Sequence, residues 1–541
     1  MIQLLDCTLR DGGYVNDWDF GYNDLCSIFQ RLTDAGVDII ETGFIDERRP
    51  FDINRSIMPD TQAVFGIFGK IPQRPPMVVG MIDYGTCSFK QIQPCEDSWL
   101  DGIRVIFKKY RMREAMAFCA ELKKYGYHVF AQMVAVTDYS SEELLEFIGL
   151  ANEVEPYAVS MVDTYGLLKP DSLRQIYDLL DKNVKSGIRI GFHAHNNLQL
   201  AFANTMAFLE YPTQRDVIVD GTLYGMGKSA GNAPLELVAM HLNEAYGKTY
   251  KINPMLEAIG ESIMSFYQKS PWGYKMYFYL SAYNEVHPDY VKQIQNKPNV
   301  SLSAVNDILG NIEPKKNKLL YDRVIGENTY AVYEESWGKD VDTIEKLRNA
   351  LGNSKPVLLV GPGRSIKLQE DKIAEFIDKN HPIVLAVNYI PRTMQVHYVF
   401  VTKVNRYREM AGQLLETQNQ EIQIIATSNV TPRGKQFAYT LTREPLLEKE
   451  EEIVDNSFLM LLKVLRQCGL HRLYLAGFDG YSDHEDNYFN PRMEYVFVKN
   501  AAGNLNHHIR SVLEEEYSDM ELEFITYSRY TEVQDSYDGA F

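Results

Sequence analysis

The sequence predicts an α/β protein with an N-terminal TIM (β/α)8 barrel, a helical extension and a C-terminal Rossmann-like α/β domain. Three observations predict this order. Strand-like and helix-like segments alternate over about the first 250 residues, an aromatic helical stretch follows, and a new strand with a glycine turn begins near residue 354. At 541 residues the chain is too long for one ordinary core, so several domains are expected.

Eight segments of the first half have the apolar, β-branched character of buried strands. Between most of them lie segments with helical periodicity; one places Leu25, Ile28 and Leu32 on one face and ends at Gly36. Eight such units match the size of a TIM barrel, and an open, doubly wound sheet is the alternative. The eight predicted strands are residues 2–7, 37–44, 77–84, 102–107, 128–136, 158–164, 188–195 and 217–223.

Two further regions follow the predicted barrel domain of residues 1–250. Residues 251–345 read as helical and aromatic, which predicts an extension without strands. Residues 346–541 contain a new alternation of strands and helices, so we expect a separate Rossmann-like domain. Its strands are expected near 354–360, 382–389, 398–404, 422–427 and 472–481, and its helices at 370–380 and 456–469.

The composition excludes several classes of protein. A formal charge of −18 argues against nucleic acid or an anionic membrane as the main partner. No run of eighteen apolar residues and no charged-then-apolar leader is visible, so neither a transmembrane segment nor a secretory signal is expected. The six cysteines form no CxxC pair, which disfavours structural zinc and disulfides. A cytoplasmic location fits this pattern.

Two motifs carry the chemistry that a barrel of this kind would need. In "GFHAHNN" (191–197), His193 and His195 alternate along a strand, so both face the same side at the carboxyl end of the seventh strand. Asp11, in "DCTLRDGG" (6–13), is expected at the end of the first strand, two strands away around a closed barrel. Two histidines and one carboxylate form a facial site for a divalent cation. An isolated HxH is more often a pair of core histidines, and the second motif shifts the balance towards metal.

With "GMGKSAGNAPLE" (225–236), these motifs resemble those of the DRE-TIM metallolyases, the superfamily of HMG-CoA lyase-like lyases and synthases. "AGNAPLE" (230–236) is typical of its 4-hydroxy-2-oxo acid aldolases, which include 4-hydroxy-2-oxovalerate aldolase. The resemblance covers about residues 1–250. It implies Mn²⁺ or Mg²⁺ held by three residues of the motifs, with Asn232 as a candidate further ligand. The three implied ligands are Asp11, His193 and His195.

The resemblance implies a class II aldolase, which makes or breaks the bond between a pyruvate-type enolate and an aldehyde. Arg10 corresponds to the second electrophile of the family, and its permanent charge suits a developing oxyanion. A barrel-mouth salt bridge is the structural alternative for Arg10. Glu41, at the end of the second strand, matches an acidic position of the family; a buried ion pair is an equal alternative.

Tyr14 departs from the family pattern. Pyruvate-releasing aldolases usually have a catalytic histidine three positions after the metal aspartate, and here that position is Tyr14. A phenol titrates near pH 10 and an imidazole near 6.5, so Tyr14 is the poorer base. It is expected to replace the base, to bind substrate or donate a hydrogen bond, or to pack at the barrel mouth. Because Tyr14 replaces the histidine of the family pattern, the sequence does not identify the aldehyde substrate.

The second domain carries a weaker signal. "VLLVGPGRSI" (357–366) is a strand followed by a glycine turn, where Gly361 and Gly363 could admit a phosphate. With "VLAVN" (384–388) and "LAGFDGY" (475–481), it resembles the Rossmann-like domains of pterin diphosphokinase-like proteins and of some bacterial sialyltransferases. That resemblance implies a nucleotide or nucleotide sugar and a link to surface-polysaccharide or sugar biosynthesis. A scaffolding domain is the alternative.

Three functions are therefore weighed from the sequence. The leading one is a metal-dependent aldolase acting on a 2-oxo acid and an aldehyde. The first alternative is a Claisen-type acyl-CoA synthase or lyase that uses the same metal site. The second is a nucleotide-sugar-binding or glycosyl-transfer protein whose barrel is only a scaffold. A homo-oligomer is compatible with each.

Overall fold

The computed structural model describes residues 1–297, 300–313, 318–335, 340–352, 355–416, 421–430, 436–484, 486–490, 493 and 496–531. The chain divides into two compact units. The first comprises Met1–Gln293 with Leu309–Arg323, and the second comprises Ile294–Ile308 with Val324–Phe541.

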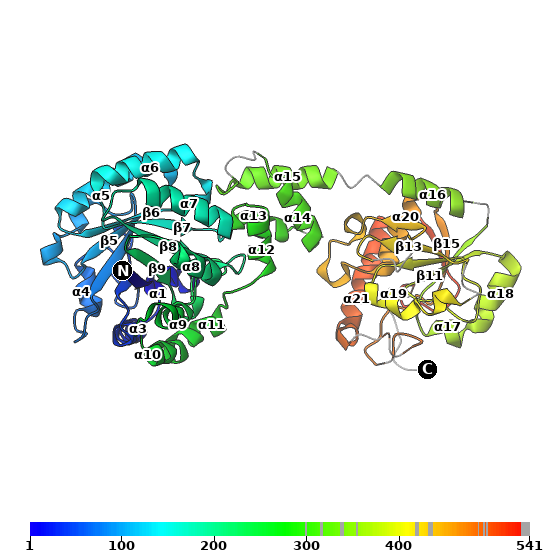
Figure 1. The fold of residues 1–541 in the computed structure, drawn as a ribbon. Helices are drawn as coiled ribbons and strands as arrows, with labels where there is room; N and C mark the ends of the chain where they lie inside the picture. The colour runs from blue at the N-terminus through cyan, green and yellow to red at the C-terminus, as the bar shows by residue number, and fades with distance from the viewer. Residues whose placement is uncertain are drawn as a thin grey trace. The chain divides into compact units, whose positions relative to one another are not determined.

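The first unit is a closed barrel of eight parallel strands (Figure 1). The barrel closes because the first strand pairs both with the second strand and with the last one, where Leu5 lies opposite Asp220. A ninth strand of two residues, β3 (Ile57–Met58), adds to the edge of the second. The barrel strands are β1 (Ile2–Asp6), β2 (Ile39–Ile45), β4 (Met77–Asp83), β5 (Gly102–Phe107), β6 (His128–Met133), β7 (Ala158–Asp163), β8 (Arg189–Ala194) and β9 (Val217–Gly221).

Helices connect successive strands and surround the barrel (Figure 1). Two short helices follow β1 directly, and seven longer ones make the outer layer. The short helices are α1 (Thr8–Asp11) and α2 (Gly13–Asn16). The outer helices are α3 (Tyr22–Ala35), α4 (Ala63–Phe68), α5 (Met112–Lys124), α6 (Ser141–Val154), α7 (Pro170–Asn183), α8 (Ala201–Glu210) and α9 (Leu235–Tyr246).

Local sequence explains why these helices form where they do. In α3, Leu25, Ile28 and Leu32 are buried against the strands, and the helix ends at Gly36 with a φ of 79° that favours glycine. In α6, the hydroxyl of Ser140 accepts the backbone N–H of Glu143, whose side chain accepts the N–H of Ser140. The apolar periodicity thus fixes the buried face, and the caps fix the ends.

The inside of the barrel is partly charged. A small apolar cluster that includes Leu5 and Phe130 fills part of it. Beside this cluster Arg104, from β5, is almost fully buried and pairs with Asp220 from β9 and with Glu41 from β2, at 3.1 Å in the second case. Buried charges persist only when they are paired, so this group ties three strands together across the interior.

Helices continue after the barrel. α10 (Ile252–Ala258) packs against α3 and is joined to α11 (Met264–Lys269) by a π-helical turn at Ile259–Ile263. Next come α12 (Met276–Tyr283) and α13 (Pro288–Gln295). Three further helices follow before the second sheet: α14 (Leu302–Gly310), α15 (Arg323–Glu335) and α16 (Val341–Leu351). Leu319, in the connection between α14 and α15, contacts the loop after β7: its carbonyl accepts the hydroxyl of Tyr165 at 3.1 Å.

The second unit contains a seven-stranded parallel sheet in the order β14-β13-β12-β11-β10-β15-β16. The chain winds outwards from β10 in one direction and then returns to its other side, so β10 and β15 flank a topological switch point. The strands are β10 (Val357–Val360), β11 (Ile383–Val387), β12 (Tyr398–Val401), β13 (Gln423–Thr427), β14 (Tyr439–Leu441), β15 (Arg472–Ala476) and β16 (Glu521–Phe524).

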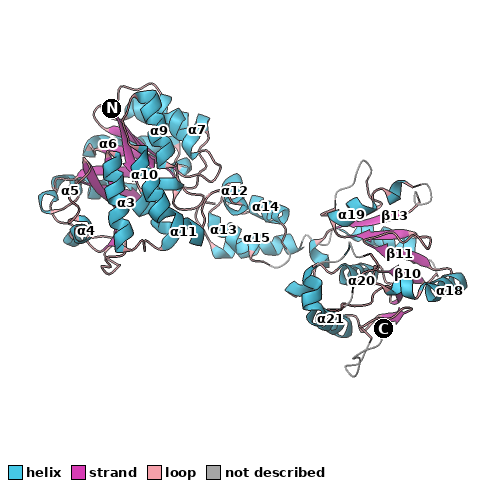
Figure 2. Ribbon diagram, turned by 90° about the horizontal axis from the view of Figure 1, so that it is seen from below, coloured by secondary structure: helices cyan, strands magenta, loops and turns pink. Residues whose placement is uncertain are grey.

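Helices cover both faces of this sheet, as Figure 2 shows. Alternate residues of β10 enter different cores: Leu359 packs with α16, α20 and α21, and Leu358 packs with α17, α18 and α19. These helices are α17 (Ser365–Leu368), α18 (Glu370–Asn380), α19 (Val404–Met410), α20 (Ser457–Gln467) and α21 (Val496–Glu516).

The predicted fold class is confirmed. Each of the eight predicted barrel strands overlaps an observed one, and the sheet is closed, so the open-sheet alternative is wrong for the first unit. Within the described ranges, no helix combines the length and apolar character needed to cross a membrane. The six cysteines are all free thiols.

Candidate metal centre

The sequence predicted Asp11 at the end of the first strand. In the structure it lies one turn beyond that strand, at the end of α1. Its carboxylate is buried and points over the carboxyl ends of the strands. Oδ1 accepts the backbone N–H of Lys228 at 2.9 Å and Nδ2 of Asn232 at 3.0 Å. Oδ2 accepts from the guanidinium of Arg10. The loop after β9 and α1 therefore hold this carboxylate from two sides.

His193 and His195 stand at the end of β8 with both rings buried, as the alternation predicted. Each is oriented through Nδ1: that of His193 lies 3.0 Å from Oδ2 of Asp220, and that of His195 lies 3.3 Å from the carbonyl oxygen of Gly231. A carboxylate and a carbonyl accept, so in each ring Nδ1 carries the proton. The lone pairs on both Nε2 atoms then point towards Asp11.

The three side chains converge on one point. Nε2 of His193 and Nε2 of His195 lie 3.5 and 3.9 Å from Oδ2 of Asp11. Nε2 of His193 is buried and has no hydrogen-bond partner. A buried acceptor without a partner is rare and costly, so this atom fits a position that a cation would fill. One candidate metal-ligand group in the described part of the chain is therefore Asp11, His193 and His195.

Charge states in this cluster suit a cation. Burial alone would raise the pKa of Asp11, but Arg10 and the two imidazoles hold it well below its usual range. Burial lowers the pKa of His195 to about 3, so that ring is neutral. Burial acts in the same direction on His193, but the neighbouring carboxylates of Asp11 and Asp220 outweigh it and raise its pKa. Above that pKa the set comprises one carboxylate and two neutral imidazoles.

Arg10 and Glu41, two candidate residues for which the sequence suggested no contact with each other, form a buried ion pair. Nε of Arg10 donates to Oε2 of Glu41 at 2.8 Å, and Nη1 donates to Asp11. Glu41 also pairs with Arg104, so it bridges two buried guanidinium groups, while its Oε1 is buried without a hydrogen-bond partner. The carboxylate of Glu41 thus holds Arg10 against the candidate metal ligands.

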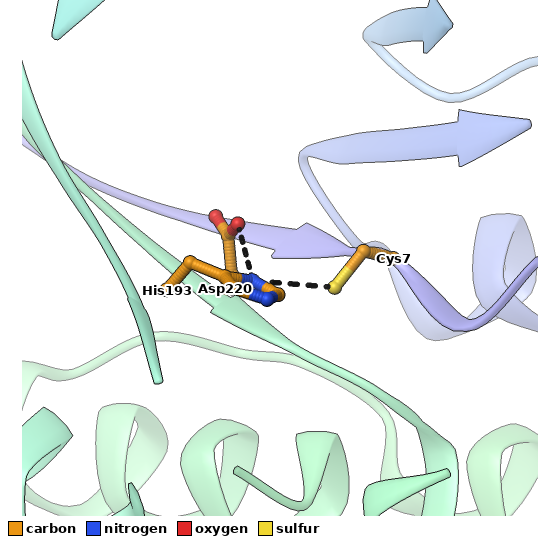
Figure 3. A group of neighbouring side chains, drawn as sticks. All are labelled: Cys7, His193 and Asp220. Atoms are coloured by element: carbon orange, nitrogen blue, oxygen red, sulfur yellow. Dashed lines mark hydrogen bonds and ion pairs between the residues drawn. The ribbon is translucent and has the colours of Figure 1, made fainter. Parts of the chain in front are cut away.

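Asp220 was not among the predicted site residues. Figure 3 shows its carboxylate and the thiol of Cys7 both directed at the same nitrogen, Nδ1, of the His193 ring. The Sγ atom of Cys7 lies 3.8 Å from Nδ1 of His193 and donates to the carbonyl of Gly221 at 3.3 Å. Cys7, His193 and Asp220 form a second group of potential metal ligands, which shares His193 with the first group. In this second group, Nδ1 of His193 is already paired with Asp220. We therefore read Asp220 as the residue that orients His193.

Asn232 lies in the loop after β9, beside Asp11. Its Nδ2 is used by Asp11, and its Oδ1 is buried without a hydrogen-bond partner. Gly227 makes this packing possible, because a Cβ there would lie 2.0 Å from Nδ2 of Asn232 and 2.5 Å from Oδ1 of Asp11. The glycine of this loop therefore serves close approach to the site.

Tyr14 lies in α2 near the mouth of the barrel. Its ring packs edge-on against Trp18, 4.9 Å between centroids, and against Phe44, 6.3 Å away. The residue as a whole remains 43% exposed. Partial burial and the charge of Asp11 raise the pKa of Tyr14 to about 12, so the phenol is protonated at neutral pH.

Lys228, Tyr165 and His287 complete the mouth. Nζ of Lys228 lies 5.4 Å from the ring centroid of Tyr14 and 6.0 Å from that of Tyr165. Burial lowers the pKa of Lys228, partly offset by Asp11. The ring of His287 lies 5.7 Å from that of Tyr165, so the helical extension reaches the mouth.

Gly361 and Gly363 belong to the second unit and follow β10. A cavity of about 150 Å³ lies at the carboxyl ends of β10, β11 and β15, with Gly363 and Asp479 among its lining residues. The backbone N–H of Ser365 and its hydroxyl both donate to Asp479, the first at 2.7 Å. A carboxylate of the protein therefore occupies the N–H group that a phosphate would use. The nucleotide stays a prediction.

Comparison with known proteins agrees with this geometry. The family model HMGL-like matches residues 106–258. The 4-hydroxy-2-oxovalerate aldolase 2 of Salinispora arenicola is 30% identical over 244 residues, which cover 45% of this chain and 68% of the relative. The 2-isopropylmalate synthase of Listeria welshimeri is 27% identical over 255 residues, 45% of this chain and 48% of the relative.

Among solved structures, the N-terminal domain of a candidate aldolase from Bacteroides vulgatus aligns with a TM-score of 0.46 and 21% identity, over 56% of this chain and 98% of that domain. The first unit of this chain is a closed TIM barrel with a polar cluster at the carboxyl ends of its strands. Given the family-model match and the aldolase relative, the chain belongs to the HMGL-like family of the DRE-TIM metallolyase superfamily.

Proposed function

We propose that the barrel is a divalent-metal-dependent class II aldolase that makes or breaks the bond between a pyruvate-type enolate and an aldehyde. The observation that carries this proposal is the convergence of both Nε2 lone pairs on the carboxylate of Asp11, with Nε2 of His193 buried and unpartnered. The aldolase relative that is 30% identical supports the reaction class.

The donor set fits a divalent cation. Asp11, His193 and His195 would hold it, and the unpartnered Oδ1 of Asn232 is a candidate further donor. Oxygen and imidazole donors suit Mn²⁺ or Mg²⁺. When bound, such a cation supplies a Lewis acid for the oxygens of a 2-oxo acid.

Arg10 would stabilise negative charge on the 2-oxo acid. Its guanidinium is buried, keeps its proton at every relevant pH and lies beside the proposed ligand Asp11. Glu41 fixes its direction through Nε. A preoriented cation of this kind stabilises an oxyanion without reorganising during the reaction.

Tyr14 would handle the proton on the aldehyde side. Because its pKa is raised to about 12, its hydroxyl is a hydrogen-bond donor near pH 7. In condensation, the aldehyde oxygen gains a proton as the new bond forms, and a protonated phenol can supply it. Tyr14→Phe should therefore preserve exchange of the pyruvate methyl protons but slow carbon–carbon bond cleavage by about a hundredfold or more. An unchanged cleavage rate would reduce Tyr14 to a packing role.

The test of the proposed function is exchange of the pyruvate methyl protons in D₂O, followed by NMR on the metal-loaded protein. The wild type should exchange them, and Arg10→Ala should lose most of the exchange while keeping the metal. Lys185→Ala, which removes an exposed ion pair with Glu155, is the control and should not change the rate. If neither pyruvate nor 2-oxobutyrate exchanges with the wild type, the acyl-CoA alternative replaces this proposal.

A further inference from the structure

Lys228 lies in the loop between β9 and α9, beside the residues proposed to hold the metal. Its backbone N–H donates to Oδ1 of Asp11 at 2.9 Å. The preceding Gly227 is packed so tightly against Asp11 and Asn232 that no larger residue fits. The backbone at residue 228 is therefore fixed, and its side chain starts from a defined point at the edge of the site.

The ammonium group of Lys228 lies between two aromatic rings at the mouth. Tyr14 follows β1 and Tyr165 follows β7, and Nζ lies 5.4 and 6.0 Å from their ring centroids. In the barrel these strands are separated by β8 and β9. The cation is thus held over the opening, on the side where Tyr14 would meet the aldehyde.

This ammonium group lacks the kind of partner that the other buried cations have. Arg10 and Arg104 each contact two carboxylates. Across the ranges that the structure describes, Nζ of Lys228 makes no ion pair or hydrogen bond, and Asp11, Asp83 and Asp289 act on it only at longer range. A half-buried cation without a counter-ion is unfavourable, so an anion is the group that this position would bind best.

We propose that Lys228 binds a second anionic group of the substrate, carried by the aldehyde. The substrate class would then be aldehydes, and the corresponding 4-hydroxy-2-oxo acids, that bear a carboxylate or a phosphate beyond the reacting carbon. This inference rests on the proposed function. The first anionic group, the carboxylate of the 2-oxo acid, belongs with Arg10 deeper in the barrel, whereas Lys228 faces the mouth.

The reaction itself is unchanged by this group. Pyruvate loses one methyl proton, its carbon forms a bond to the aldehyde carbon, and the aldehyde oxygen gains one proton. No oxidant or reductant is needed, and the distal anion remains intact. Lys228 is therefore a specificity-determining residue, whose contribution appears in the choice of aldehyde.

The test compares aldehydes of similar size in condensation with pyruvate by the metal-loaded, full-length protein. Butyraldehyde is neutral, succinic semialdehyde carries a carboxylate, and glycolaldehyde phosphate carries a phosphate. The wild type should prefer at least one anionic aldehyde by about tenfold to a hundredfold in kcat/KM, the range of a charge-assisted hydrogen bond. The two anionic compounds separate carboxylate from phosphate recognition.

Lys228→Met should remove this preference, because kcat/KM for the anionic aldehyde should fall about tenfold to a hundredfold further than kcat/KM for butyraldehyde. Lys228→Arg should retain most of it, because the positive charge is kept. Lys108→Met is the matched control: Lys108 is exposed after β5, and its charge acts on His287 at the mouth. This control should keep the preference of the wild type.

Three results would overturn the inference while leaving the proposed function intact. These are a wild type that prefers butyraldehyde, a preference that survives in Lys228→Met, and a Lys228→Met variant whose KM for pyruvate exchange rises instead. The last result would assign Lys228 to the carboxylate of pyruvate. Absence of pyruvate exchange in the wild type would instead sink the proposed function, and this inference with it.

Discussion

The mouth of the barrel and the crevice of the C-terminal sheet both lie at the carboxyl ends of parallel strands. They differ in whether their buried polar atoms have hydrogen-bond partners. In the barrel, buried polar atoms stay unpartnered: Nε2 of His193, Oδ1 of Asn232 and Oε1 of Glu41. In the crevice, the side chain of Asp479 is fully engaged by Ser365. Buried polar atoms that lack hydrogen-bond partners are the ones that a bound ligand would satisfy, whereas the carboxylate of Asp479 already has its partners within the protein.

Removal of the two imidazoles is expected to have the largest effect. His193→Ala combined with His195→Ala should weaken Mn²⁺ binding by about a thousandfold or more, because two of three ligands are lost. Metal analysis after chelation and reloading measures this. Near-unit occupancy of the double variant would mean that the unpartnered atoms have another purpose.

A second test concerns orientation. Asp220→Asn should weaken metal binding by about tenfold to a hundredfold, since Asp220 fixes the tautomer and direction of His193. Isothermal titration of the apoprotein measures it, and circular dichroism checks that the loss of the Arg104 partner leaves the barrel folded. Equal affinity in a folded variant would show that packing alone orients the ring.

Metal binding by the barrel should also depend on pH. The pKa of His193 is raised above 6.5, and a proton on its Nε2 would occupy the atom proposed to bind the metal. Affinity should therefore be full above that pKa and fall by about tenfold for each pH unit below it, with one proton released per ion bound. Neither Asp11 nor His195 titrates in this window. Competition titrations from about pH 5.5 to about pH 8.5 would measure this dependence. A metal affinity that does not change over that range would contradict the prediction.

The smallest effect is expected in the second unit. Asp479→Ala leaves the buried N–H and hydroxyl of Ser365 without their carboxylate, which should cost about 2–3 kcal/mol in the stability of that unit. Thermal unfolding measures the cost, and metal binding by the barrel is the internal control. A neutral effect on stability would suggest that Asp479 is held in place for a ligand.

The strands and the metal-binding candidates could be predicted because their signals are local. Eight apolar runs announce eight strands, and alternation along 191–197 places both imidazoles on one face. Arg104 and Asp220 could not be paired from the sequence, because they are 116 residues apart and meet only when the barrel closes. A charge inside the apolar run "GIRVIF" was the one available signal.

The glycine turn after β10 shows the opposite difficulty. Gly361 and Gly363 suggested room for a phosphate, but a Cβ at Gly361 would lie 2.5 Å from the carbonyl oxygen of Gly477, and one at Gly363 would lie 2.5 Å from the carboxylate of Asp479. Contact between two loops distant in sequence therefore accounts for both glycines. The final strand β16 and helix α21 were also not predicted, because their apolar residues are too sparse for a clear period.

The backbone contact from Lys228 to Asp11 has a consequence for protein engineering. The N–H that holds the carboxylate belongs to the main chain, so eighteen of the nineteen replacements at position 228 would retain it, and only proline would remove it. Saturation mutagenesis of codon 228 would therefore vary the side chain at the barrel mouth while the contact that holds Asp11 is kept. Side chains of very different chemistry can be tried at this position without disturbing the carboxylate beside it.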